Sequence, residues 1–158
     1  MFRPMRRFKN ALSEEQTKEL LKKTKRAAFA VHGEEGYPYA VPIDFYYDEE
    51  ENRIYFHSAK AGHKLDAIRA NDKVCFTTWD DGYTEPGEWA PHVSGCVVFG
   101  RARVVEDRAV ALDKIRKFAL KYYPSEEEAD LEIQKDFDKA CMIAIDIEHM
   151  TGKRIQEK

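Results

Sequence analysis

Residues 37–66 read YPYAVPIDFYYDEEENRIYFHSAKAGHKLD, and this stretch decides the fold. Within 37–47 the side chains at every second position are apolar or aromatic, which is typical of a β-strand with one buried face. The polar run 48–52 indicates a turn, and 53–57 indicates a second strand. Because a short turn joins antiparallel neighbours, the stretch predicts an antiparallel sheet. The residues that share the buried face are Tyr39, Val41, Ile43, Phe45 and Tyr47.

Strand patterns on both sides of this stretch extend the sheet. The strands that we expect are 27–32, 37–47, 53–57, 73–79, 92–106 and 141–147. They do not alternate regularly with helices, which argues against a Rossmann-type parallel sheet. Most of their connections are short, and this favours antiparallel strands that close into a small barrel. The sequence therefore predicts a mainly β fold with flanking helices, in which six antiparallel strands form a barrel.

Helices are expected between the strands. Ser13 with Gln16, and Ser125 with Glu128, are spaced as capping boxes, so helices begin at both serines. Shorter signals predict a helix over 62–70 and another that Asp107 caps and Pro124 ends. The apolar side of the helix after Asp107 is expected to be Val110, Leu112, Ile115, Phe118 and Ala119.

Two further segments are expected to lack regular structure. Residues 80–91, DDGYTEPGEWAP, contain two glycines and two prolines and predict a loop of functional length. Gly152 predicts a turn that leads from the last strand into a charged tail. A chain of 158 residues is long enough to form a core without disulfides or a structural metal. We therefore expect one domain over 1–158.

Composition excludes several classes of function. The chain of 158 residues has 26 Lys+Arg and 29 Asp+Glu, a net charge of −3, which argues against a nucleic-acid partner. No apolar stretch approaches the ~20 residues that cross a bilayer, so we expect no membrane partner. Cys75, Cys96 and Cys141 are too far apart for a zinc motif and fit a reducing compartment. With no apolar segment after the basic N-terminus, the protein is expected to be cytoplasmic.

Pro42 lies in the middle of the strand pattern 37–47. Proline has no N–H to donate to a sheet, so its strand lies at an edge or leaves part of its backbone unpaired. The backbone of the adjoining Ile43 and Asp44 would then be free to bind a planar heterocycle. An ordinary edge strand without a ligand explains the same proline.

A second pattern, FHSAKAGHKLD at 56–66, favours binding of an anion. A strand ends near Ser58, and a helix begins near Gly62 with Lys64 in its first turn. Helix N-termini carry free N–H groups and partial positive charge, and a lysine there is unfavourable unless an anion offsets it. A phosphate is the simplest ligand for this arrangement, although the lysines of this segment could also be solvated surface residues.

Other catalytic motifs are absent from the sequence. It contains no nucleophile elbow, Walker A motif, GxGxxG or HExxH. His57 and His63 are six residues apart, which is poor spacing for metal ligands on one helix face, so no metal site is expected. His57 itself is either a structural histidine or a residue that places a proton during catalysis.

Four segments carry a resemblance to a known family. They are GEEGYPYAVPIDFYYD at 33–48, RIYFHSAKAGHKLDAIRANDKVCFT at 53–77, VVFGRARVVED at 97–107 and IDIEHMTGK at 145–153. In this order they resemble the FMN-binding split-barrel proteins related to pyridoxamine 5′-phosphate oxidase, over about 5–154. Within that group the chain is most similar to the Nim-type 5-nitroimidazole-resistance reductases. The resemblance implies a six-stranded Greek-key split barrel, a homodimer and FMN between the subunits.

The resemblance also implies positions for the cofactor. The isoalloxazine ring would be lined by Val41, Pro42, Ile43 and Asp44. Along the ring edge and the phosphate would lie His57, Ser58, Ala59 and Lys64. Thr77 would contact the cofactor from the fourth strand, and the partner subunit would contribute Trp89 to Ser94. If His57 lies at the flavin in this way, it is the candidate catalytic residue; the alternative is a structural histidine. Because the sequence ends at TGKRIQEK, it lacks the C-terminal Arg and His segment of true pyridoxamine phosphate oxidases. The resemblance therefore argues against oxidation of pyridoxine phosphate.

Three functions are compatible with these residues. The first is an FMN-dependent oxidoreductase that passes electrons from a donor to a small aromatic acceptor, such as a nitro compound. The second is a related barrel that uses a deazaflavin or haem. The third is a flavin-binding or flavin-storage protein without catalytic activity.

Overall fold

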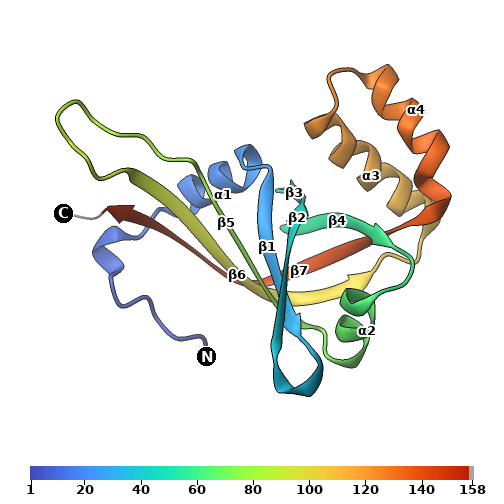
Figure 1. Ribbon diagram of the computed structural model, residues 1–158, viewed down its shortest axis with the longest axis horizontal. Helices are drawn as coiled ribbons and strands as arrows, with labels where there is room; N and C mark the ends of the chain where they lie inside the picture. Colours follow the sequence, from blue (N-terminus) through green and yellow to red (C-terminus); the bar gives the residue numbers. More distant parts are fainter. Residues whose placement is uncertain (157–158) are drawn as a thin grey trace.

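The computed structural model describes residues 1–156, and Figure 1 shows a strongly curled sheet with helices at its edges. The strands are β1 (Arg26–His32), β2 (Pro38–Asp44), β3 (Tyr46–Asp48), β4 (Arg53–Ala59), β5 (Lys73–Trp79), β6 (His92–Val104) and β7 (Ala140–Gln156). The α-helices are α1 (Glu14–Lys23), α2 (His63–Ala70), α3 (Arg108–Tyr122) and α4 (Glu126–Asp136). Single 3-10 turns lie at Phe8–Asn10, Glu34–Gly36 and Phe137–Lys139.

The sheet has seven strands in the order β2-β1-β5-β6-β7-β4-β3, and all neighbours are antiparallel. The sheet curls into a half-barrel, which confirms the expected split barrel with flanking helices. β2 and β3 are the two edge strands, although they follow each other in the chain. The barrel is therefore open along a seam between β2 and the β3–β4 pair.

The expectation of six strands was wrong because the pattern 37–47 forms two strands, β2 and β3. Phe45 separates them, and its backbone bonds to α3 instead of to a neighbouring strand. The Tyr122 hydroxyl accepts from the Phe45 N–H at 2.8 Å and lies 2.7 Å from the Phe45 carbonyl oxygen. The period of two continues through the break, because Ile43, Phe45 and Tyr47 are all buried. A side-chain pattern does not reveal a break of this kind.

The last strand extends beyond the expected end at 147. β7 pairs with β6 as far as the pair Gln156–His92, and the expected turn at Gly152 does not exist. Gly152 is buried in the strand, where a Cβ atom would lie 2.2 Å from Thr17 Oγ1. Glycine is therefore required there because α1 packs directly on the strand. Of the expected tail, residues 157–158 lie outside the described residues.

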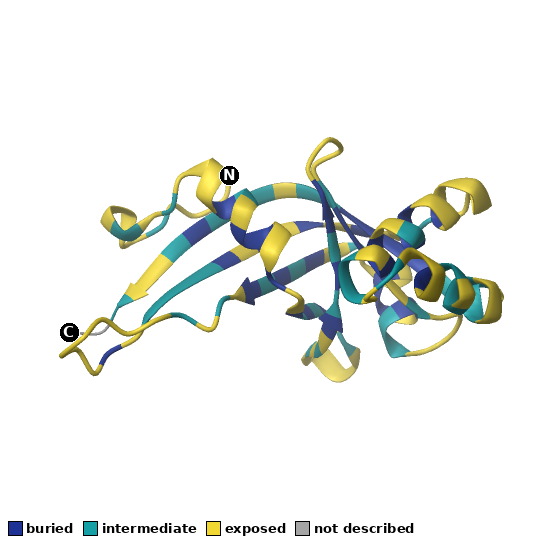
Figure 2. Ribbon diagram, turned by 90° about the horizontal axis from the view of Figure 1, so that it is seen from above, coloured by how far each residue is buried: buried dark blue, intermediate teal, exposed yellow. Residues whose placement is uncertain are grey.

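The core fills the concave side of the sheet, and buried bands alternate with exposed ones along the strands (Figure 2). A second apolar layer lies between α3 and the outer face of β4 and β7. Of the expected apolar side of α3, Ile115, Phe118 and Ala119 are buried, but Val110 and Leu112 are exposed. Lys114 is buried instead, at 5% exposure, and pairs with Asp48 at 2.8 Å and with Glu51.

The helices begin where the capping residues predicted. Ser13 and Gln16 form the reciprocal capping box, and Asp107 accepts from two N–H groups of α3. Ser125 accepts from the Glu128 N–H and caps α4, but the reciprocal bond from the Ser125 N–H to the Glu128 side chain does not form, so only half of the expected capping box is present. In the described chain no helix is long and apolar enough to cross a membrane.

Candidate functional site

β2 is an edge strand, as Pro42 predicted, and one side of its backbone faces the seam. Pro42 pairs with Ala28 of β1, and both side chains point to the convex side of the sheet. Val41 and Ile43 point the other way, into the core. Of the residues expected to line a planar ring, therefore, only Pro42 and Asp44 offer side chains to the convex side.

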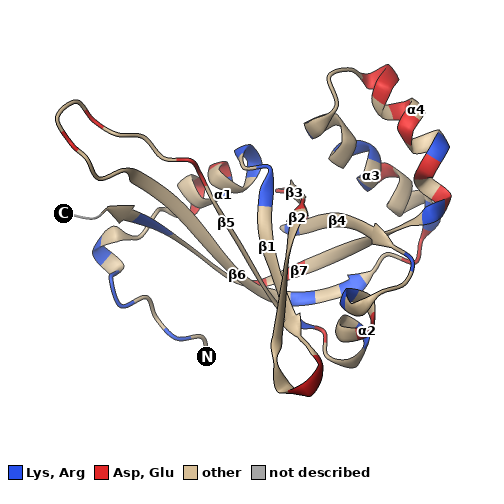
Figure 3. Cartoon of the chain, in the orientation of Figure 1, with Lys and Arg blue, Asp and Glu red and all other residues tan. Residues whose placement is uncertain are grey.

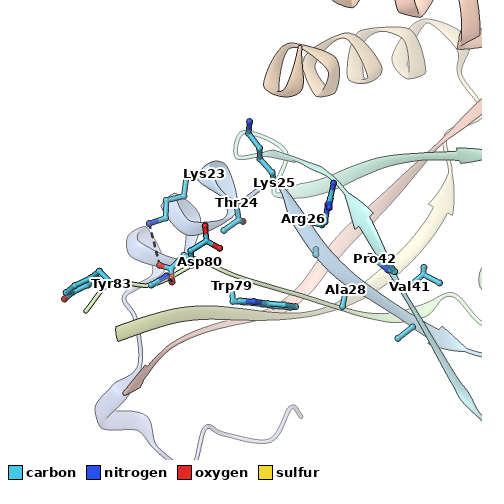
Figure 4. Close-up of a pocket in the computed structure, with 14 residues that line it drawn as sticks. Lys23, Thr24, Lys25, Arg26, Ala28, Val41, Pro42, Trp79, Asp80 and Tyr83 are labelled. Atoms are coloured by element: carbon cyan, nitrogen blue, oxygen red, sulfur yellow. Dashed lines mark hydrogen bonds and ion pairs between the residues drawn. The ribbon is translucent and has the colours of Figure 1, made fainter. Parts of the chain in front are cut away.

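A groove of about 890 Å³ lies where the start of β1, the middle of β2 and the end of β5 meet (Figure 4). Its walls are Lys23 to Ala28, Ala40 to Pro42 and Trp79 to Tyr83. The Trp79 side chain is 56% exposed and extends beside Ala28. The groove thus combines a flat aromatic wall, small side chains and an open strand edge.

Charged residues surround the mouth of this groove. Arg26 pairs with Asp44 across β1 and β2 at 3.1 Å, and Lys23 pairs with Asp80 at 3.7 Å. Lys25 has no ion pair among the described residues, and its ammonium lies 5.9 Å from the Tyr122 ring centroid. Lys25 is therefore a basic residue of the groove that no carboxylate neutralises, although its side chain is directed toward Tyr122 and away from Trp79 (Figure 4).

α2 begins at Gly62 as predicted, with Lys64 in its first turn. Its N-cap is Gly62, at φ 141°, a conformation that favours glycine, and no side chain caps the helix. Lys64 lies half-buried in the first turn, and Ser58 lies half-buried near the end of β4. The free N–H groups of the first turn and the nearby cation together suit a phosphate.

His63, at the first position of α2, has an unusual environment. Its Nε2 atom is buried and lacks a hydrogen-bond partner in the described part of the chain. Its ring stacks on Tyr39 of β2, with the ring centroids 4.0 Å apart. A buried polar atom without a partner is costly, and a ligand at this end of the seam would remove that cost.

His57 points away from the core, beside α3. Its ring meets Phe118 edge-on, with the centroids 5.0 Å apart, and the residue is exposed. Desolvation by surrounding protein atoms lowers the pKa of His57; Asp44 opposes this shift, and the Lys64 charge adds to it. The seam therefore brings Asp44, His57 and Lys64 within electrostatic range of one another, although they lie on three different elements.

The other expected residues lie apart from this group. The Thr77 hydroxyl donates to the Cys96 carbonyl at 2.9 Å, and the Ser94 N–H donates to Asp80 Oδ1 at 2.9 Å. Trp89 is 80% exposed in the loop 80–91 and does not line the groove. Ala59 is the exposed last residue of β4. One chain alone thus assembles the β2, β4 and α2 part of the predicted site.

Sequence analysis assigned no role to Lys25 and Lys121. Trp79, an aromatic residue that could stack on a flat ligand or lie in the core, is the last residue of β5, and Lys25 directly precedes β1. Lys121 of α3 lies with its ammonium 4.0 Å above the Phe45 ring and 3.1 Å from the Phe45 carbonyl oxygen. Burial and the Lys25 charge lower the pKa of Lys121 to about 8. Its position in an ordinary amphipathic helix gave no signal.

These elements define the class: a split β-barrel with an anion site at the start of α2 and a groove across β1, β2 and β5. The chain belongs to the pyridoxamine 5′-phosphate oxidase family, whose model matches residues 13–154. This match confirms the family that the sequence motifs indicated. No curated protein matches the sequence significantly.

Solved structures share the fold at low sequence identity. A protein from Bacteroides thetaiotaomicron, provisionally assigned to 5-nitroimidazole antibiotic resistance, is 17% identical with a TM-score of 0.75, covering 92% of this chain and 87% of its own. The flavocytochrome Anf3 from Azotobacter vinelandii is 22% identical with a TM-score of 0.78, covering 98% and 75%. An FAD-binding protein from Mesorhizobium loti is 19% identical with a TM-score of 0.66, covering 92% and 96%.

Proposed function

We propose that the protein binds FMN along the seam and acts as an FMN-dependent oxidoreductase toward a small aromatic acceptor. The observation that carries this proposal is the uncapped N-terminus of α2, with Lys64 in its first turn, beside the open edge of β2. A phosphate and a flat ring joined by a short chain would match these two features. The names of two similar structures, an FAD-binding protein and a flavocytochrome, support a flavin or a related redox group.

The residues at the seam fit FMN in three respects. The helix N–H groups, Ser58 and Lys64 supply donors for a phosphate, and His63 Nε2 is a buried atom that needs a partner. The groove volume of about 890 Å³ lies in the ~300–1,000 Å³ range of small-molecule sites. The unpaired edge of β2 near Pro42 offers backbone N–H and C=O groups to the polar edge of a ring.

In this proposal the flavin supplies the redox chemistry, and the protein supplies position and electrostatics. Lys64 and Ser58 hold the phosphate, while Trp79 and Pro42 exclude water from one side of the groove. Because its pKa is lowered, His57 is mainly neutral at pH 7 and can accept a hydrogen bond. It would hold a proton or a substrate oxygen at the seam, and the electron donor would approach from solvent.

We further propose that the protein is a homodimer through the convex side of the sheet. The paired residues there form rows of small and apolar side chains, such as Ala28, Thr77 and Val97. Phe99 and Trp79 are also exposed on this side. A monomer would leave this apolar surface in water. A partner subunit would cover it and would bring Trp89 to Ser94 toward the groove.

A second candidate is a flavin-binding protein without catalytic activity, and a third is the same fold with haem or a deazaflavin. The name of one similar structure, a flavocytochrome, supports the alternative with haem. The absorption spectrum of the purified protein separates the cofactors, since flavin and haem absorb at different wavelengths. Turnover separates an enzyme from a storage protein.

The test of function is a reductase assay with the FMN-loaded protein. A chemical reductant or a nicotinamide nucleotide supplies electrons, and a nitroaromatic compound and pyridoxine 5′-phosphate serve as alternative substrates. We expect reduction of the nitro compound and no oxidation of pyridoxine phosphate. His57→Gln should lower turnover by roughly 10²-fold or more if His57 places a proton, while FMN stays bound and the exposed control His32→Gln has no effect. Full flavin occupancy without turnover of any acceptor would favour the storage protein.

A further inference from the structure

A second cavity lies on the far side of His57 from the core, between the helices α3 and α4. Its volume is about 170 Å³, and it shares no lining residue with the groove at β2. Ile115, Phe118 and Ala119 of α3 line one wall, at the i, i+3, i+4 spacing of one helix face. Ile133 of α4 lies opposite, and His57 closes the end toward the sheet.

The size and the apolar walls of this cavity suit a single aromatic ring. An engineered apolar cavity of about 150 Å³ stays free of water and binds benzene. The cavity here is of similar volume, and the rings of Phe118 and Phe137 contribute to its lining. Aromatic walls also attract a cation placed against a ring face.

One side of the cavity is acidic. Glu132 and Asp136 of α4 line it, one helical turn apart, and α4 as a whole is strongly acidic (Figure 3). Asp136 pairs with Lys139 at 3.1 Å and also shares a side-chain hydrogen bond with Glu132, while Glu132 has no ion pair within the part of the chain that the structure describes. Glu132 is only partly exposed, although it faces an apolar cavity. A carboxylate beside an apolar cavity is stabilised by an organic cation whose apolar group fills the cavity.

We propose that the cavity between α3 and α4 is a binding site for a small aromatic amine, which places its ring among Ile115, Phe118 and Ile133 and its ammonium group at Glu132. The two carboxylates argue against an anionic ligand. The described residues contain no cluster of three ligating side chains, so a bare metal ion is not expected there. The inference goes beyond the proposed function, since it requires neither flavin nor dimer.

The test is titration of the purified full-length protein with benzylamine, followed by ¹⁵N NMR. Benzyl alcohol is the matched probe, because it has nearly the same shape and no positive charge. Benzylamine should shift the amide signals of residues near 115–119 and 132–137 in a saturable manner. Benzyl alcohol should bind at the same place at least tenfold more weakly, the factor that one charge-assisted hydrogen bond readily supplies.

Two variants sharpen the test. Glu132→Gln should weaken benzylamine about tenfold and leave benzyl alcohol unchanged, whereas Glu127→Gln, on the exposed side of the same helix, should alter neither. Ile133→Phe should fill the cavity and weaken both probes, and its NMR spectrum shows whether it folds. Shifts that do not saturate, that fall elsewhere, or that respond equally to both glutamate variants would overturn the proposal. FMN binding is scored separately, so failure at this cavity is distinct from failure of the proposed function.

Discussion

Lys64 is the side chain on which the proposed phosphate site depends most. It lies in the first turn of α2, whose N–H groups have no side-chain cap. Lys64→Ala should weaken FMN by roughly 10- to 150-fold, because a hydrogen bond to a charged group contributes about 1.5–3 kcal/mol. Riboflavin lacks the phosphate and should bind the variant as before. Titration of both ligands by flavin fluorescence measures the difference, with Arg69→Ala at the other end of α2 as the control. Equal losses for FMN and riboflavin would place Lys64 away from the phosphate.

Lys121 should make stability depend on pH. Its pKa is lowered to about 8 from an ordinary value of 10.5. Below pH 8 the Lys121 amine is protonated in both the folded and the unfolded state, so the folded state bears the full cost of burying its charge. Between pH 8 and 10.5 only the unfolded state keeps the proton, so the free energy of unfolding should rise with pH. Tyrosines such as Tyr122, whose pKa is raised to about 12, reverse the trend above pH 10.

Urea unfolding between pH 8 and 10 checks this prediction. The rise should disappear in Lys121→Met and persist in Lys117→Met, an exposed position one turn earlier on α3. If both variants keep the same slope as the original protein, another group causes the pH dependence.

Residues whose chemistry conflicts with their local element could be predicted from the sequence. Pro42 in a strand and Lys64 at a helix start both violate local preference, and both lie at the seam. Lys121 and Trp79 are both common residue types in the elements that contain them, so neither conflicts with a local preference. Their role depends on α3 and β5 packing beside β1 and β2, which no local pattern encodes.

At the scale of elements, α3 is bonded to the break between β2 and β3. The Tyr122 hydroxyl is bonded to both backbone groups of Phe45 and lies 2.5 Å from the Lys25 carbonyl oxygen. Tyr122→Phe leaves the Phe45 N–H without a partner and should cost about 1–3 kcal/mol of stability. Chemical denaturation measures the loss. Tyr123→Phe, a neighbouring exposed tyrosine, should cost far less, and similar losses in the two variants would mean that the hydroxyl is not the cause.

Elements with strong end signals were predicted to within a few residues. Ser13, Asp107 and Ser125 all cap helices as expected. Phe45 and Gly152 misled the interpretation because each takes its conformation from a distant element: Phe45 from α3, and Gly152 from α1. The alternation of apolar side chains and the presence of a glycine indicate only the local preference of the chain, so they cannot reveal a contact with a distant helix.

At the scale of the whole molecule, the convex side of the sheet should be a dimer interface. Val97 is exposed there and pairs with Thr77 and Thr151 in neighbouring strands. Val97→Glu places a charge in the middle of this surface, so it should convert a dimer into single chains of 18.4 kDa and release FMN. Light scattering gives the mass. Leu131→Glu, on α4 and 65% exposed, should leave the mass unchanged. A dimer that tolerates Val97→Glu must use another surface.

In the proposed function, a flavin is held with its phosphate at α2 and its ring along β2. The most direct test is the absorption spectrum of the purified protein, followed by chromatography of what it releases on denaturation. We predict a flavin spectrum and release of FMN, about one per chain after loading with added FMN. A protein that is colourless and takes up no FMN, or one that releases haem instead, would contradict the account.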